Sequence, residues 1–169
     1  MKEILIEVDG KKIKAFVEDD VHKELTQPVK KTGYEVVEDR QNYWTVIGTS
    51  EVHCSTEVNS LIDRKLSDSV NYYSDRTVAE NNARADKLMR RLRRFAVEYR
   101  EKELGWKDNG SSKFKIIFDH NEKIIFVDDN QWMQTYGTIY FDTKKAAKLA
   151  IDTFKDELLW YFTEYKDSL

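Results

Sequence analysis

The first part of the chain alternates apolar and polar residues on both sides of a two-residue turn. Asp9-Gly10 separates two alternating runs, the first with apolar residues at positions 4, 6 and 8 and the second at positions 13, 15 and 17. Asp-Gly between alternating strands is a strong hairpin signal, because a type I′ turn needs a positive φ at both central residues. The pattern predicts a β-hairpin over residues 1–17 and a short helix at 21–25.

The next stretch is rich in β-branched and aromatic residues. Within residues 33–56, positions 34–37 lead into a turn and a strand follows at 43–47. The stretch at 59–70 is polar and weakly patterned, which predicts a loop with a short helix at 61–66.

A second hairpin is predicted in the C-terminal half. Its strands are 114–118 and 123–127, joined by a polar turn that begins at Asp119, and a third short strand is predicted at 138–141.

The clearest periodicity is helical and extends over about residues 75–104. Ser74 or Asp75 is placed to cap its start, and Gly105 to end it. The apolar positions recur at steps of three and four, which places them on one stripe. They are Ala85, Leu88, Leu92, Phe95 and Tyr99. Thirty residues is long for a helix of a globular protein, so a kink or an earlier end is compatible with the pattern.

A last helix is predicted from Lys144 to about Tyr165, capped by Asp142 or Thr143. Its inner positions are Ala147, Ala150, Ile151, Phe154, Leu158, Phe162 and Tyr165. A short motif also recurs: Tyr72-Tyr73-Ser74 precedes the first long helix and Tyr140-Phe141-Asp142 precedes the last. In both places an alanine follows the second aromatic residue by the same interval. One local match is too little to establish a duplicated fold.

These elements together predict an α+β fold. We expect an N-terminal β-hairpin lobe at 1–32 and an α+β module at 33–169. In the module, an antiparallel sheet packs against a long basic helix and a C-terminal aromatic helix. One proline and six glycines argue for long regular elements and against a disordered chain.

Composition narrows the compartment and the class of protein. A single cysteine excludes a disulfide framework and a multi-cysteine zinc site, and it is typical of a reducing cytosol. The acidic N-terminus does not resemble a signal peptide, and no apolar run approaches the length of a membrane span. The net charge of −3 excludes both a basic nucleic-acid coat and a heavily acidic DNA mimic.

A dense run of basic residues lies on the first long helix. On one helical face are Arg84, Lys87, Arg91 and Arg94, and on the other side of the apolar stripe are Arg90 and Arg93. Arginine favours bidentate contacts with carboxylates and phosphates. Three interpretations stay open: a solvated face paired with some of the 31 acidic residues, a surface for an acidic protein groove, and a phosphate-binding surface.

An aromatic cluster near the C-terminus is the second candidate surface. Residues 159–162 are all large and cannot all face one core from a helix, so at least one is expected to be exposed or to meet another lobe. The alternative is a helix sandwiched between a sheet and a second helix. From both surfaces, the candidate partner-binding residues are Arg84, Lys87, Arg90, Arg91, Arg94, Trp160, Tyr161 and Tyr165.

The sequence contains no catalytic motif. The three histidines, His22, His53 and His120, are scattered, and none belongs to a His-Glu-x-x-His motif. The glycines are isolated, so no phosphate-binding loop is present. The acidic stretch 128–130 lacks the remaining ligands of a calcium loop. We therefore expect no enzyme activity, no metal and no cofactor.

Three segments of the chain support a family resemblance. They are 71–74 with the basic helix that follows, 113–119 with its hairpin, and 137–142 with the aromatic helix that ends at 157–162. Together they resemble a C-terminal module shared by small proteins of bacteriophages and prophages of Gram-positive bacteria. In that family an aromatic strand, a long helix, a hairpin, a Y-F-x-T/S strand and an aromatic helix follow in this order. The match covers about residues 33–166.

The resemblance implies a function that spacing and composition do not. Small phage proteins often bind and disable a host machine, and some proteins with such modules resemble anti-CRISPR inhibitors of Cas9. The resemblance therefore implies a phage-encoded, non-catalytic inhibitor of a host defence protein, with a Cas9 nuclease as the expected partner. It would act in the host bacterial cytoplasm, away from the membrane. The alternative is a nucleic-acid-associated phage accessory protein that binds phosphates through the Arg84–Arg94 helix face.

Overall fold

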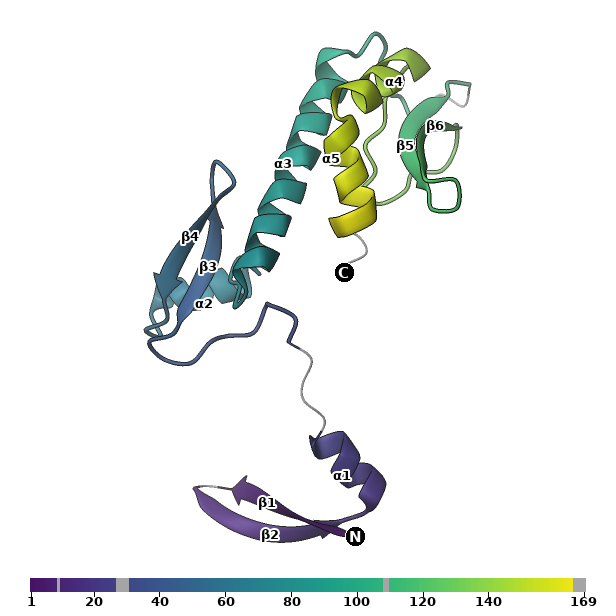
Figure 1. Ribbon diagram of the computed structural model, residues 1–169. Helices are drawn as coiled ribbons and strands as arrows, with labels where there is room; N and C mark the ends of the chain where they lie inside the picture. The colour runs from purple at the N-terminus through teal and green to yellow at the C-terminus, as the bar shows by residue number, and fades with distance from the viewer. Residues whose placement is uncertain (9, 27–30, 108–109, 166–169) are drawn as a thin grey trace.

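The computed structural model describes residues 1–8, 10–26, 31–107 and 110–165. Within these residues the fold is α+β, as predicted, with three antiparallel hairpins and five α-helices (Figure 1). The hairpins form three separate two-stranded sheets. The single antiparallel sheet that we expected for the module is therefore divided between two hairpins.

The N-terminal lobe consists of β1 (Lys2–Val8), β2 (Lys11–Val17) and α1 (Asp19–Thr26). The predicted hairpin is present, with Ile4 opposite Ala15, and Gly10 has a φ of 74°. Asp9, the other turn residue, lies outside the described residues. In Figure 1 this lobe stands apart from the rest of the chain.

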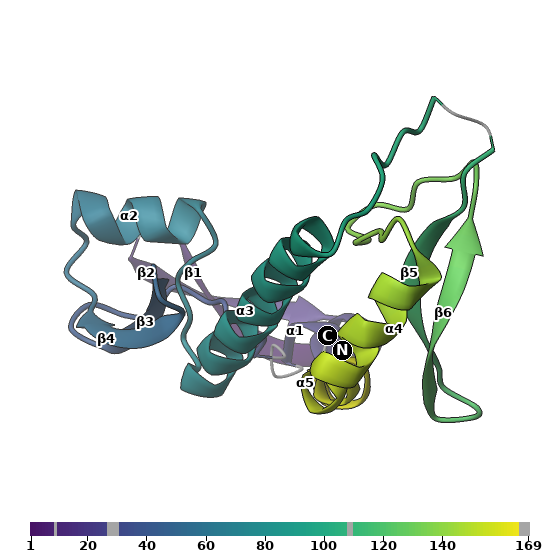
Figure 2. The ribbon, with the colours of Figure 1, turned by 90° about the horizontal axis from the view of Figure 1, so that it is seen from above.

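The second hairpin comprises β3 (Asn42–Ile47) and β4 (Glu51–Thr56), and α2 (Leu61–Asp68) lies along one side of it (Figure 2). Residues 34–37, which we placed in a β-rich stretch, are not a strand. Two backbone N–H groups there bond to side chains instead of to a neighbouring strand: Tyr34 donates to the Thr32 hydroxyl at 3.3 Å, and Val37 donates to the Tyr72 hydroxyl at 3.4 Å.

The long helix α3 (Arg76–Glu98) begins where the sequence predicts and ends earlier. Asp75 is the N-cap, and its carboxylate accepts from the N–H groups of residues 77 and 78. The predicted stop at Gly105 is wrong. The chain leaves the helix because the Asp142 carboxylate accepts, at 2.6 Å, from the N–H groups of both Glu101 and Lys102.

The third hairpin comprises β5 (Lys113–Asp119) and β6 (Ile124–Asn130). The last helix is not continuous: it divides into α4 (Lys144–Thr153), α5 (Lys155–Trp160) and a π-helical turn, η1 (Tyr161–Tyr165). The division falls at Phe154, whose φ of −114° departs from helical geometry. The main core lies between α3, α4, α5 and β5, and its largest buried members are Leu88, Leu92, Phe95, Phe141, Phe154 and Leu158.

The short repeated motif marks a repeated structure. Tyr73 exchanges two backbone hydrogen bonds with Trp44 of β3, and Phe141 exchanges the same two with Phe114 of β5, all at 2.7–2.9 Å. An N-cap residue and a helix follow each of these bridges, and the alanine at the same position in each helix is completely buried. The predicted strand at 138–141 is reduced to this single bridge. Residues 42–79 and 113–147 thus share one hairpin–bridge–helix arrangement.

Gly33 provides a test of how tightly the first of these units packs. Its φ is +86°, and a Cβ there would lie 2.6 Å from Cγ2 of Val78. Gly33→Ala should therefore lower the free energy of unfolding by about 1–3 kcal/mol, measured by urea denaturation. Gly48 is the matched control, because a Cβ there meets nothing within 4 Å, and Gly48→Ala should change stability by less than about 0.5 kcal/mol. Equal losses in the two variants would contradict this account.

Candidate partner-binding surfaces

Two of the predicted arginines join α3 to α5. The Arg84 guanidinium lies 3.7 Å from the centre of the Trp160 ring. Arg91 forms an ion pair with Glu157, and its guanidinium lies 4.8 Å from the Phe154 ring. Cation–π contacts and ion pairs of this kind hold neighbouring helices in register. These two side chains therefore have a structural role within the chain.

The remaining candidates on α3 differ from one another. Arg94 pairs with Glu98 one turn later, at 2.6 Å, and Arg90 donates to the Ser50 hydroxyl at the β3–β4 turn. Lys87 is exposed and lines a groove between α3 and β4. The structure thus brings the predicted basic residues onto one helix, but it engages most of their guanidinium groups in contacts within the chain.

The predicted C-terminal aromatic residues are largely covered. Trp160 is 7% exposed, Tyr161 and Tyr165 are half-buried, and the Tyr165 hydroxyl donates to the Asn82 side chain at 2.9 Å. Among residues 159–162 the exposed side chain is Leu159. The helix is packed between α3 and β5, which corresponds to the sandwiched alternative.

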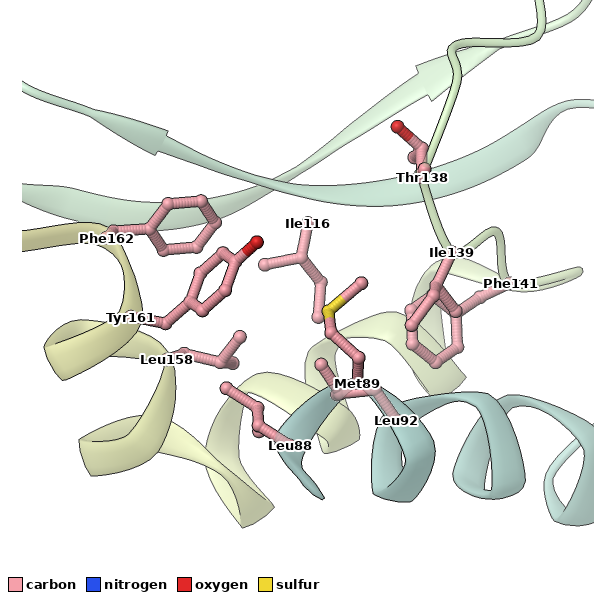
Figure 3. Close-up of a pocket in the computed structure, with 11 residues that line it drawn as sticks. Leu88, Met89, Leu92, Ile116, Thr138, Ile139, Phe141, Leu158, Tyr161 and Phe162 are labelled. Atoms are coloured by element: carbon pink, nitrogen blue, oxygen red, sulfur yellow. The ribbon is translucent and has the colours of Figure 1, made fainter. Parts of the chain in front are cut away.

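A pocket of about 200 Å³ opens beside this helix (Figure 3). Its walls are apolar side chains of α3, β5 and α5, among them Leu88, Ile116 and Leu158. Tyr161 and Thr138 bring hydroxyl groups to its lining. Pockets for drug-sized ligands measure about 300–1,000 Å³, so this one is smaller than a typical ligand pocket.

The loop at 131–137 is a further candidate surface, which the hydrophobic pattern of the chain does not predict. Trp132 is 65% exposed, Met133 is 70% exposed and Tyr136 is fully exposed. The Asn130 side chain fixes the start of the loop by accepting at 3.0 Å from the N–H groups of residues 132 and 133. At its other end, Gly137 lines the apolar pocket. The signal in the sequence is large apolar residues in a segment without strand or helix periodicity.

Two tyrosine–carboxylate pairs form the interior of the β3–β4 unit. The Tyr43 hydroxyl donates to Asp63 at 2.7 Å, and the Tyr72 hydroxyl donates to Glu57 at 2.6 Å. The two rings stack at 4.0 Å. Burial, with the adjacent carboxylate, raises the pKa of Tyr43 to about 12 and the pKa of Tyr72 further. These shifts follow from packing and hydrogen bonding that hold α2 against the hairpin.

Asp63 makes this unit sensitive to acid. Its pKa is lowered to about 2 because the Tyr43 hydroxyl and groups of Ser60 donate to the carboxylate. A lowered carboxyl pKa stabilises the fold above the ordinary value of 3.8, and the stabilisation is lost as the pH falls toward 2. Asp63→Asn should lower stability at neutral pH and flatten the decline between about pH 4 and pH 2 in urea titrations. An unchanged pH profile would contradict this role.

Comparisons with known proteins do not assign a family. No model of a protein family matches the chain, and neither the curated proteins nor the solved structures contain a match. In the described ranges, no three His, Cys, Asp or Glu side chains gather as a group able to hold a metal ion. None of the described helices combines the length and apolar character needed to cross a membrane.

Proposed function

We propose that this chain is a phage-encoded inhibitor that binds a host defence protein and blocks it without catalysis, with a Cas9 nuclease as the first candidate. Its place of action would be the host bacterial cytoplasm. The family resemblance of residues 33–166 is the reason for naming Cas9. The structure contributes surfaces suited to binding a protein.

The proposal rests mainly on the loop at 131–137. Tryptophan, tyrosine and methionine are enriched where proteins bind each other, and a few such residues supply most of the binding energy. Here Trp132, Met133 and Tyr136 are all exposed within one short loop beside an apolar pocket. Large apolar side chains gathered on a surface are typical of an interaction site.

The charge arrangement favours a protein over a nucleic acid as the partner. Phosphate binding needs several cationic groups free to approach one backbone. On α3, the guanidinium groups of Arg84, Arg91 and Arg94 contact Trp160, Glu157 and Glu98. Releasing them for phosphates would cost those contacts.

The test is an inhibition assay with purified Cas9 and guide RNA. The protein is titrated against a fixed amount of the nuclease complex, and cleavage of a labelled DNA target is measured. A stoichiometric blocker abolishes cleavage when the two are present in about equal amounts. Undiminished cleavage at a large molar excess would remove Cas9 as the target.

Salt dependence distinguishes the nucleic-acid alternative. If Arg84, Lys87, Arg90, Arg91 and Arg94 bind phosphates, affinity for a DNA or RNA oligonucleotide falls steeply and linearly on a log–log plot against salt. We expect the affinity for the protein partner to fall less steeply over the same range, because fewer charges take part. A steep salt dependence with an oligonucleotide alone would favour the nucleic-acid function.

A further inference from the structure

The outer edge of β4 is open for pairing, whereas that of β3 is closed. On β3, the backbone groups of Trp44 pair with Tyr73, and those of Val46 pair with the side chain of Asn71. These groups point away from β4, so Trp44 and Val46 face Cys54 and Val52 as non-hydrogen-bonded pairs. The N–H and C=O groups of Val52 and Cys54 therefore point outward. No described residue bonds to them.

A groove lies between β4 and α3. On one side it is lined by consecutive residues of the turn and of β4, 50–53, and no β3 residue takes part. On the other side it is lined by Arg76, Glu80, Arg84 and Lys87 of α3. Successive residues of one strand that line a groove together indicate that the groove follows the strand's edge.

The groove has a small excess of positive charge, with Arg76, Arg84 and Lys87 against Glu51 and Glu80. Arg76 and Glu80 form an ion pair at 2.8 Å and compensate each other. Lys87 remains, Arg84 contributes its charge while its guanidinium stays over Trp160, and Arg90 reaches the same turn through its bond to Ser50. Glu51 is the acidic residue on the strand side. An extended chain placed along β4 would therefore lie beneath a cationic row.

We propose that the open edge of β4 binds an extended, acidic segment of the partner protein, which adds to the β3–β4 sheet as a further strand. Main-chain hydrogen bonds to Val52 and Cys54 provide affinity, as in other cases of strand addition. Acidic side chains at alternate positions meet Lys87 and its neighbours. This inference rests on the proposed protein-binding function and specifies where and how one segment of the partner is held.

A second copy of the chain suits this edge poorly. Pairing β4 with β4 would bring two basic grooves together, and like charges placed opposite each other weaken strand pairing. An acidic strand paired with β4 would instead be attracted by the basic side chains of the groove. The charge of the groove therefore selects the occupant.

The sole cysteine of the chain gives a direct measurement, because Cys54 is exposed in the middle of this edge. The probe is a capped peptide that alternates glutamate with valine or threonine. We expect it to slow the reaction of Cys54 with a thiol reagent, and we expect saturable binding by fluorescence anisotropy. The same peptide with lysine in place of glutamate should do neither.

Four substitutions separate backbone pairing from charge. Cys54→Pro removes an outward N–H that the hairpin does not use, so the fold is retained while strand addition is blocked. Cys54→Ser keeps that N–H and should bind as the parent does. Lys87→Glu should weaken peptide binding about tenfold, whereas Arg93→Glu, on the same helix but outside the groove, should have no effect.

The outcomes that overturn the proposal are specific. They are absence of saturable binding by the glutamate peptide, equal binding by the lysine peptide, and full binding by Cys54→Pro with its far-ultraviolet spectrum intact. Self-association that Cys54→Pro abolishes would assign the edge to a second copy instead.

If Cys54→Pro still inhibits Cas9, the inference fails while the inhibitor function stands. If the parent protein binds the peptide but does not inhibit Cas9, the inhibitor function fails while the inference of strand addition stands.

Discussion

Replacement of Phe141 by alanine should lower the free energy of unfolding by about 3–5 kcal/mol. Phe141 is 1% exposed, belongs to the main core and lines the apolar pocket of about 200 Å³. Removal of its ring would join a new void to a space that is already open. The surrounding side chains cannot close a void of that size, so the loss should fall in the upper part of the range.

Urea denaturation at neutral pH measures this effect. Phe126→Ala is the control, because that ring lies on β6 with 37% of its surface exposed and should cost about 1 kcal/mol. The backbone bridge between Phe114 and Phe141 does not depend on the ring and should survive the change. A loss at position 141 below about 1 kcal/mol would show that this residue is not a centre of the core.

Joint truncation of Trp132 and Tyr136 to alanine should weaken partner binding by about a thousandfold while the fold is retained. Truncating a single interface hot spot costs about 2 kcal/mol or more, which is roughly a thirtyfold loss of affinity. Two such losses in one short loop would move a nanomolar complex toward the micromolar range. Both side chains project into solvent, so stability should change by no more than about 0.5 kcal/mol.

The measurement is the amount of protein that half-inhibits the nuclease complex, compared between parent and variant. Leu61→Ala with Ile62→Ala is the matched control, since both side chains are 68% exposed but lie on α2, away from the loop. An unchanged inhibition curve for the loop variant would remove residues 131–137 from the binding surface. An equal loss in the control would indicate a general effect of apolar truncation.

The starts of the helices were predictable because their signals are local. Asp75 and Thr143 are N-cap residues within one turn of the N–H groups that they satisfy, so the sequence contains the whole interaction. The end of α3 was not predictable in this way. Asp142, far along the chain, captures the two N–H groups that lead the chain away from the helix. No periodicity in the sequence reports such a contact.

For the candidate surfaces too, local patterns were predictable from the sequence and contacts between distant residues were not. Helical spacing placed the basic residues on α3 correctly, but it did not show that Arg84 would cover Trp160 or that Arg91 would find Glu157. The open edge of β4 depends on which neighbours close β3, and these are Asn71 and Tyr73. The loop at 131–137 lacks the hydrophobic period of a helix or a strand, so no sequence pattern points to it. The identity of the partner stays a prediction.

The contrast between Trp160 and Trp132 gives the chain two distinct intrinsic fluorophores. Trp160 is shielded beneath a guanidinium group at the contact between α3 and α5, whereas Trp132 is mostly in solvent. Trp44 and Trp106 are part-buried and emit as well, so the measurement uses a variant with phenylalanine at both positions, in which the iodide-quenchable emission reports on the loop. The emission that iodide does not quench comes from Trp160 and reports whether α3 and α5 remain packed together. In that variant, binding and unfolding are optically separable without an added label.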